Sequence, residues 1–249
     1  HDTGHTSASS LKGIISEPKL RWAANYYYYP EAIVAGDVEG NGSTEILFID
    51  WIRTGTGTWM PILVCLNGWD GSMKWTSAEK APGVSLAGTA PVLDDVDGNG
   101  SKEIFVSTQS GVASLSSRGE PLWEAILPTP GGELQVADVD GDVRKEAIAV
   151  SGVELWALDA MTGTVKWRSS EVAPEVSLGN CYVPAIGDLN DDGANEIVLS
   201  CEEAWTQGIR GKWVLAFTGQ GKGLWAYDAS TEGNLSPPVI ANLGSVVVL

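Results

Sequence analysis

The sequence predicts an all-β protein made of repeated four-stranded units, and three observations support that prediction. Short apolar runs alternate with turns rich in Gly, Asp and Asn along the 249 residues, which is typical of short strands. Four of those turns share one acidic pattern. A tryptophan recurs at positions 22, 75, 123, 167 and 225, in steps of 53, 48, 44 and 58 residues. A period of about 40 to 50 residues with four strands per unit is typical of β-propeller blades.

The acidic pattern is clearest in residues 95–103. Oxygen-bearing side chains occupy positions 1, 3, 5 and 9 of this loop, and Gly100 occupies position 6. Calcium is a hard cation that takes six to eight oxygen ligands, and glycine adopts the positive φ that closes such a turn. An EF-hand needs a helix on each side, whereas this loop lies between two apolar runs. The flanks therefore predict a calcium loop inside a strand–loop–strand hairpin.

The same pattern occurs in four loops, which we name loop A (37–45), loop B (95–103), loop C (138–146) and loop D (188–196). Clusters of Asp, Asn and Gly also form ordinary solvated turns, but four copies in one register favour calcium. We expect up to four Ca²⁺ ions. The candidate ligands, with position 7 included in each set, are Asp37, Glu39, Asn41, Ser43, Glu45, Asp95, Asp97, Asn99, Ser101, Glu103, Asp138, Asp140, Asp142, Arg144, Glu146, Asp188, Asn190, Asp192, Ala194 and Glu196.

Two loops depart from the pattern. Loop A has Glu39 at position 3, where a longer arm would loosen the site, and loop C has Val143 at position 6. We expect Gly141 to share the turn in loop C. A fifth loop near the C-terminus retains only Asn242, so we predict no metal there.

The repeats predict one propeller domain over residues 11–249, preceded by a flexible segment, 1–10. Four blades are expected at about 30–78, 90–127, 132–170 and 182–228. The C-terminal residues 237–249 supply two strands and residues 11–24 supply two more, which together make a fifth blade. Pairing of the N- and C-terminal strands closes the ring and removes an exposed sheet edge. The alternative is that the chain is a fragment of a seven- or eight-bladed ring.

The charge balance limits the partners. Lys and Arg total 15 against 32 Asp and Glu, a net charge of −17, which argues against nucleic acid and anionic membranes. No apolar run approaches the ~20 residues of a membrane span. The start at His1 fits a processed export product or a trimmed chain. Cys181 and Cys201 flank the strands around loop D, so we expect them to form a disulfide and Cys65 to remain a buried thiol.

Few residues suggest catalysis. His1 and His5 are the only histidines, which excludes a histidine-based triad or zinc site in the body of the fold. The plentiful carboxylates are mostly assigned to the four loops. We therefore assign no catalytic residue, and we expect calcium to be the only cofactor.

The loops resemble the FG-GAP/VCBS repeats of integrin α-chain propellers and many secreted bacterial proteins. Residues 155–167 also resemble the blades of quinoprotein (PQQ-like) propellers. The resemblance covers residues 11–249 and implies a calcium-binding propeller outside the cell or at its surface. Rhamnogalacturonan lyases carry similar repeats, so a polysaccharide lyase is the alternative function.

The two longest insertions, at residues 50–59 and 202–212, are expected on the side opposite the calcium loops. The reason is that connections alternate between the two ends of a meander. Exposed aromatic side chains next to polar ones suit sugar rings or protein partners. The candidate ligand-binding residues are Trp51, Trp59, Trp205, Tyr27 and Tyr28. We expect a noncatalytic adhesion, glycan-binding, protein-binding or self-assembling module, with a homo-oligomer or filament possible. The five recurring tryptophans are expected to pack in the core or between blades.

Overall fold

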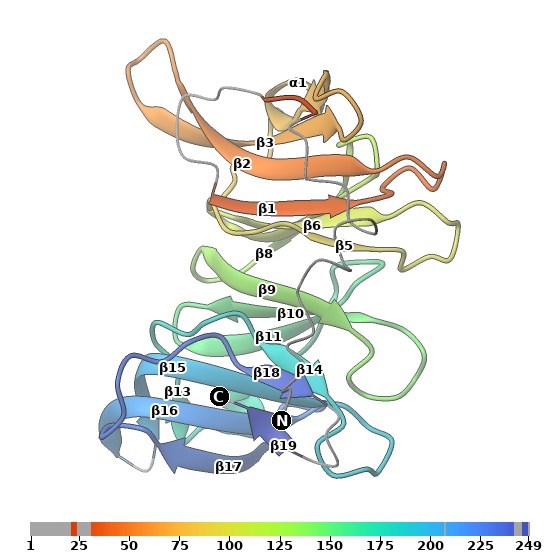
Figure 1. Ribbon diagram of the computed structural model, residues 1–249. Coiled ribbons are helices and arrows are strands. Elements are labelled where there is room, and N and C mark those ends of the chain that lie inside the picture. Colours follow the sequence, from red (N-terminus) through yellow and green to blue (C-terminus); the bar gives the residue numbers. More distant parts are fainter. Residues whose placement is uncertain (1–20, 24–30, 207, 242–245, 249) are drawn as a thin grey trace, which may run out of the picture.

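The computed structural model describes residues 21–23, 31–206, 208–241 and 246–248. These residues form an all-β fold of antiparallel sheets (Figure 1). Sheet A contains β1 (Glu31–Gly36), β2 (Glu45–Arg53), β3 (Trp59–Asn67) and β4 (Met73–Thr76). Sheet B contains β5 (Val92–Asp94), β6 (Glu103–Thr108), β7 (Gly111–Leu115) and β8 (Pro121–Ile126). In both sheets the strands pair in chain order, as an up-and-down meander.

Two further meanders follow, and the chain ends in a hairpin. Sheet C contains β9 (Gly131–Ala137), β10 (Glu146–Ser151), β11 (Glu154–Asp159) and β12 (Val165–Arg168). Sheet D contains β14 (Ala185–Gly187), β15 (Glu196–Thr206), β16 (Ile209–Thr218) and β17 (Gly223–Asp228), with β13 (Val176–Ser177) also paired to β15. Sheet E contains β18 (Val239–Ala241) and β19 (Val246–Val248). Single helical turns, α1 (Ser77–Lys80) and α2 (Ser169–Val172), follow sheets A and C.

The predicted all-β fold with repeated four-stranded units is confirmed. The helical turns α1 and α2 and the strand β13 were not anticipated, because each is too short to produce a sequence period. The ring of five blades stays a prediction. Its fifth blade needs residues 11–24, of which only 21–23 belong to the described part of the chain.

The middle strands of the sheets are buried on both faces, which explains their continuous apolar sequences. Successive residues of a strand point to opposite faces, and the core follows that alternation. In β6, Ile104 packs with Leu47 of sheet A, whereas the next residue, Phe105, packs with Ala147 of sheet C. In β15, Leu199 packs toward sheet C. The sheets therefore follow one another face to face in chain order.

The recurring tryptophans join consecutive sheets. The indole Nε1 of Trp22, Trp123 and Trp167 donates to a carbonyl in the β3–β4, β11–β12 and β16–β17 turn, respectively, each at 3.0 Å. The ring of Trp123 lies over Gly163, where a Cβ would come within 2.5 Å of the ring. A larger residue at Gly163 would push the sheets apart.

Trp225 departs from the expected packing between blades. Trp75 is 4% exposed, but Trp225 on β17 is 43% exposed. Among the described residues, no glycine lies under the Trp225 ring in the way that Gly163 lies under the Trp123 ring.

Candidate metal loops and the opposite aromatic face

The four loops share one hydrogen-bond scheme. The Glu at position 9 is buried in every loop, and its Oε2 accepts from the N–H of position 2 at 2.8 to 3.0 Å. The Asp at position 1 accepts from the N–H of position 6 at 2.7 to 3.0 Å. The side chain at position 5 accepts from the N–H of position 7 at 2.7 to 2.8 Å. The repeated sequence pattern therefore gives one repeated loop structure.

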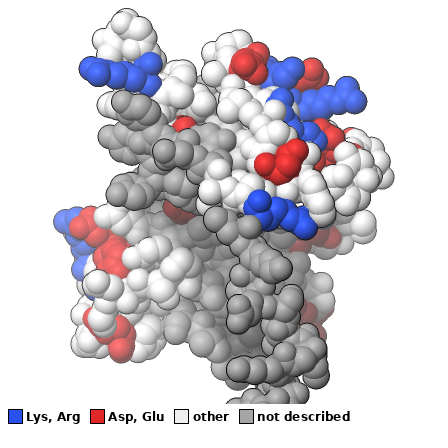
Figure 2. Space-filling model, turned by 45° about the horizontal axis from the view of Figure 1, so that its top comes forward, with Lys and Arg blue, Asp and Glu red and all other residues white. Residues whose placement is uncertain are grey.

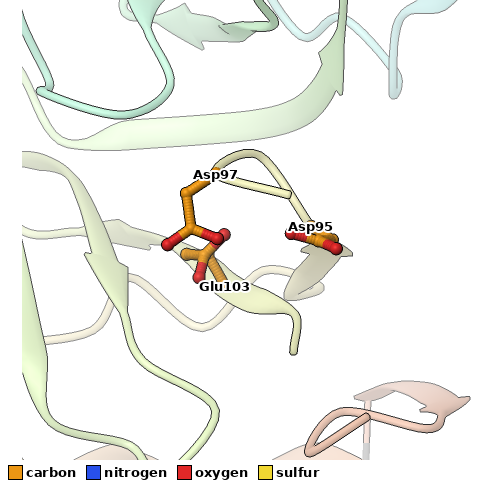
Figure 3. A group of neighbouring side chains, drawn as sticks. All are labelled: Asp95, Asp97 and Glu103. Atoms are coloured by element: carbon orange, nitrogen blue, oxygen red, sulfur yellow. The ribbon is translucent and has the colours of Figure 1, made fainter. Parts of the chain in front are cut away.

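Loops B and C gather their acidic side chains most closely. One oxygen each from Asp95, Asp97 and Glu103 lies within 4.8 Å of the others. Figure 3 shows the carboxylates of Asp97 and Glu103 close together, with that of Asp95 on the other limb of the loop. In loop C, one oxygen each from Asp138, Asp140 and Glu146 meets the same limit. Such all-oxygen donor sets fit a hard cation such as Ca²⁺.

A lysine from the fourth strand of the same sheet enters loops A and C. In loop A, the Nζ of Lys74 lies 2.8 Å from Oε1 of Glu39 and 2.9 Å from Oε1 of Glu45. In loop C, the Nζ of Lys166 lies 2.7 Å from both Asp140 Oδ2 and Glu146 Oε1. It also lies 3.4 Å from Asp142 Oδ2. Loops A and C therefore each contain the ammonium group of a lysine among their carboxylates.

Loops B and D have leucine at the corresponding place. Leu122 of β8 is 54% exposed and Leu224 of β17 is 46% exposed. Among the described residues, no lysine or arginine forms an ion pair with the position-9 glutamate of either loop, Glu103 or Glu196. A cavity of about 270 Å³ lies beside loop B, and Asp97, Glu103 and Leu122 are among the residues that line it.

Burial and the lysines act oppositely on the pKa values in the loops. Burial raises the pKa of Glu103, the N–H of Val96 lowers it, and the charges of Asp97 and Asp95 raise it further. Burial also raises the pKa of Glu146, but Lys166 counteracts part of that effect. Burial lowers the pKa of Lys166, yet its hydrogen-bonded carboxylates outweigh burial and the pKa rises. Loop C is thus electrostatically compensated where loop B is not.

Loop C contains a strained backbone. Val143 has a φ of 76°, close to the 89° of Gly100 at the same position of loop B. Gly141 also has a positive φ, but so does Gly98, which holds the same place in loop B. Gly141 thus contributes to the turn as Gly98 does in loop B, but it does not replace the glycine of position 6, because Val143 itself adopts the left-handed conformation. For a β-branched residue that conformation is unfavourable.

Neighbouring loops contact each other. The Ser101 hydroxyl donates to the Glu39 carbonyl at 3.1 Å, which joins loop B to loop A. The side-chain amide of Asn195 donates to the Asp138 carbonyl at 2.7 Å, which joins loop D to loop C. The loops lie along the right side of the molecule in Figure 1. If one loop becomes more or less conformationally ordered, the loop that it contacts is therefore affected as well.

The aromatic hairpins lie at the opposite ends of the strands. The β2–β3 hairpin extends to the upper left in Figure 1. It forms a pocket of about 260 Å³ lined by Asp50, Trp51, Ile52, Arg53 and Trp59. Both tryptophans are partly buried, and the ring of Trp51 lies against Gly88. Sequence reasoning did not single out Asp50, which is only 6% exposed.

The second aromatic hairpin joins β15 to β16. Trp205 is 49% exposed, and near it Arg210 pairs with Glu203 at 2.7 Å. Tyr27 and Tyr28 lie outside the described residues. The structure therefore places Trp51, Trp59 and Trp205 at the same ends of their sheets, on two separate hairpins.

A disulfide joins Cys181 and Cys201, which ties the segment before β14 to the middle of β15. Cys65 is a buried free thiol. Burial is the main reason that its pKa is raised to about 12. At neutral pH this thiol is therefore protonated and unreactive.

The molecular surface mixes both signs of charge. On the face in Figure 2, Lys and Arg side chains lie next to Asp and Glu, and the described part of that face has no broad basic patch. None of the helices in the described part of the chain has the length and apolar composition of a membrane span.

Comparison with known proteins gives weak likenesses. No protein-family model matches the chain. A segment is 27% identical over 116 residues to the outer membrane protein assembly factor BamB of Vibrio cholerae, covering 43% of this chain and 28% of that protein. The chain thus spans less than a third of the length of this relative.

Three solved structures show a distant likeness. The biofilm matrix protein Bap1 of V. cholerae is 16% identical with a TM-score of 0.45, over 86% of this chain and 43% of that one. A lectin of Agrocybe aegerita that recognises non-reducing terminal N-acetylglucosamine is 14% identical with a TM-score of 0.41, over 80% and 51%. BBS1N in complex with ARL6DN is 11% identical with a TM-score of 0.46, over 90% and 77%. All three scores are below 0.5.

Proposed function

We propose that this chain is a noncatalytic, calcium-binding β-propeller module of the FG-GAP/VCBS type that binds a glycan or a protein outside the cell. One observation supports this function above the others. Four loops with one hydrogen-bond scheme lie at one end of the sheets, and two aromatic hairpins lie at the opposite end. One end is suited to metal-dependent stiffening and the other to recognition.

The loop residues fit calcium in their chemistry. Their side-chain oxygens are carboxylates and amides, which are ligands that calcium prefers, and in loops B and C three acidic side chains bring one oxygen each within 4.8 Å of the others. A bound ion supplies the positive charge that gathered carboxylates need. Because Ser101 and Asn195 connect neighbouring loops, an ion in one loop also orders the next. Calcium therefore stiffens this end of the module.

The proposed fold is a ring of five blades over residues 11–249, closed by pairing of the two ends of the chain. Two observations support closure. Ile240 of β18 packs on Val198 and Val214, so sheet E follows sheet D as the other sheets follow one another. Trp225 has an exposed ring, where the matching tryptophans of earlier sheets cover a turn of the next sheet. In a fifth blade completed by residues 11–24, a turn of that blade would cover the Trp225 ring.

Ring closure is tested by two deletions. Deletion of residues 1–24 should cause aggregation or loss of cooperative unfolding, because it exposes a sheet edge. Deletion of residues 1–10, which precede the proposed domain, is the matched control and should leave the melting temperature unchanged. If both shortened proteins melt like the full chain, the two ends do not share a blade.

The recognition end is the β2–β3 pocket together with the β15–β16 hairpin. Trp51 and Trp59 offer flat rings for stacking on a sugar or a partner side chain, and Asp50 and Arg53 offer hydrogen bonds beside them. Aromatic rings with adjacent polar groups are the usual anchors of such surfaces. The disulfide between Cys181 and Cys201 supports an extracellular location, because disulfides persist in oxidising compartments.

A glycan array with the calcium-loaded protein tests the function. Trp51→Ala, Trp59→Ala and Trp205→Ala should each weaken binding to any glycan found by about tenfold or more, since such anchors contribute ~2 kcal/mol. Trp69→Ala is the matched control, because Trp69 is 67% exposed at the calcium-loop end. Equal losses from Trp69→Ala and Trp51→Ala would refute the aromatic face.

Product analysis of every bound glycan separates the remaining functions. Binding without cleavage supports the module. New unsaturated sugar ends would establish a polysaccharide lyase in its place. Absence of glycan binding, together with particles that assemble only in calcium, would instead establish a self-assembling subunit.

A further inference from the structure

We infer that Lys74 and Lys166 take the place of the metal in loops A and C, so that calcium binds only in loops B and D. This inference rests on the proposed function, because it takes the loops to be calcium sites. It goes beyond that function by assigning the occupant of each loop. The residue that decides the assignment lies outside the loop, on the fourth strand of the same sheet.

The deciding residue holds one structural position in all four sheets. It lies immediately before the recurring tryptophan, at a register shift between the third and fourth strands. The shift falls between Cys65 and Leu66 in sheet A, and the other three sheets have it at the matching point. A β-bulge redirects one side chain out of the regular alternation. The four residues placed there are Lys74, Leu122, Lys166 and Leu224.

At this position the lysines reach their loops. The backbone N–H of position 2 uses the Oε2 of each position-9 glutamate, which leaves Oε1 for a cation. Lys74 and Lys166 bind that Oε1 in loops A and C at 2.9 and 2.7 Å. Each ammonium also binds the side chain at position 3, Glu39 or Asp140, at 2.8 or 2.7 Å. An ammonium has three donors; these two acidic ligands use two of them, and in loop C Lys166 donates the third to Asp142 Oδ2 at 3.4 Å.

A calcium ion in loop A or C would need the same oxygens. It could not share Glu45 or Glu146 with an ammonium a few ångströms away, because two cations repel each other strongly where water is scarce. The side chains of Glu45 and Glu146 are 2% and 1% exposed, so little solvent screens that repulsion. Calcium would have to displace the lysine from two carboxylates. The lysine-containing loops are therefore stable without metal.

Loop B differs from loops A and C in what lies beside its gathered carboxylates. Glu103 is 6% exposed, and in the described chain no lysine or arginine forms an ion pair with it. Leu122 lines the cavity beside Asp97 and Glu103 and brings no charge to it. A buried carboxylate with two acidic neighbours needs a cation. In loop D, Glu196 is 3% exposed, no described lysine or arginine forms an ion pair with it, and Leu224 holds the bulge position before Trp225.

Calcium titration by isothermal calorimetry, with exchanges of the deciding residue, tests this assignment. The unaltered protein should bind two Ca²⁺ ions. Lys74→Leu and Lys166→Leu should each add one site, to give three. Leu122→Lys and Leu224→Lys should each remove one, to leave one. Lys80→Leu, which alters an exposed lysine on α1, is the control and should leave two sites. Circular dichroism melts verify that each variant is folded.

The outcomes separate the inference from the function on which it rests. Four sites in the unaltered protein, unchanged by either lysine exchange, would overturn the inference and leave the calcium module intact. Two sites in the unaltered protein and in all four exchange variants would also overturn it. No calcium binding by any variant would refute the calcium function itself. If the lysine variants do not fold, a Leu122→Lys variant that keeps both sites is sufficient to overturn the inference.

Discussion

Sheets A and C differ from sheets B and D in one respect, although their loops share one pattern and one hydrogen-bond scheme. In sheets A and C the residue before the recurring tryptophan is lysine, and its ammonium lies among the loop carboxylates. In sheets B and D that residue is leucine, and the glutamate at position 9 has no cationic partner among the described residues. The comparison teaches that the acidic motif alone does not determine what occupies a loop. In loops A and C the ammonium comes from a lysine 29 and 20 positions after the position-9 glutamate, respectively.

Calcium removal gives the largest expected effect. Two sites, each about tenfold below the ambient calcium concentration in Kd, would contribute ~3 kcal/mol together, whereas four would contribute ~5 to 6 kcal/mol. For a domain of this size, ~3 kcal/mol corresponds to a fall of about 6 to 12 °C in Tm. Thermal melts in excess EDTA and in millimolar calcium measure the fall. An unchanged Tm would mean that calcium does not stabilise the fold.

Matched glutamine substitutions should separate the two kinds of loop. Glu146→Gln breaks the ion pair with Lys166 and should lower the free energy of unfolding by about 1 to 2 kcal/mol, in EDTA and in calcium alike. Glu103→Gln removes an uncompensated buried charge, so it should stabilise the protein by up to ~1 kcal/mol in EDTA. In calcium it removes a ligand and should destabilise. Chemical unfolding in both conditions measures these values, and equal responses of the two variants would contradict the distinction.

The strained valine offers a smaller and independent test. Val143→Gly should stabilise the protein by up to ~1 kcal/mol, because the cost of the left-handed conformation exceeds the entropic cost of glycine. Gly100→Val is the reverse exchange at the same position of loop B and should destabilise by ~1 to 2 kcal/mol. Urea unfolding midpoints measure both. A destabilising Val143→Gly would show that the valine side chain has a packing role.

The smallest expected effect is a pH dependence of loop B in EDTA. The folded-state pKa of Glu103 is raised by burial, so folding favours its protonated form. Its contribution to stability is therefore most favourable below the unfolded pKa of ~4.3 and is lost as the pH rises through the folded value. The advantage of Glu103→Gln over the unaltered protein should shrink between pH 7 and pH 4. An advantage that stays constant with pH would mean that Glu103 does not titrate in this range.

The sequence predicted most of the regular structure. The tryptophan period and the apolar runs predicted repeated four-stranded units, and sheets A, B and C are four-stranded meanders in chain order. Local patterns of this kind are set by alternation and turn chemistry, which a single sequence shows directly. The short elements α1 and β13 gave no signal, because a single turn or a two-residue strand has no period.

The occupants of the loops could not be predicted from the motifs. Lys74 lies 29 residues from Glu45, and only the bulge before Trp75 aims its side chain at the loop. The one available signal was the alternation of Lys-Trp and Leu-Trp along the repeats. That alternation does not indicate which side chains face the loops until the register of the fourth strand is known. Val143 was visible as a departure from glycine, but its left-handed backbone was not.

The most direct test of the account is the position of calcium in crystals grown with it. A long-wavelength anomalous difference map should show peaks in loop B, among Asp95, Asp97 and Glu103, and in loop D. Loops A and C should show none, with Lys74 and Lys166 still bound to their glutamates. Four peaks of equal height, with both lysines displaced into solvent, would contradict the account.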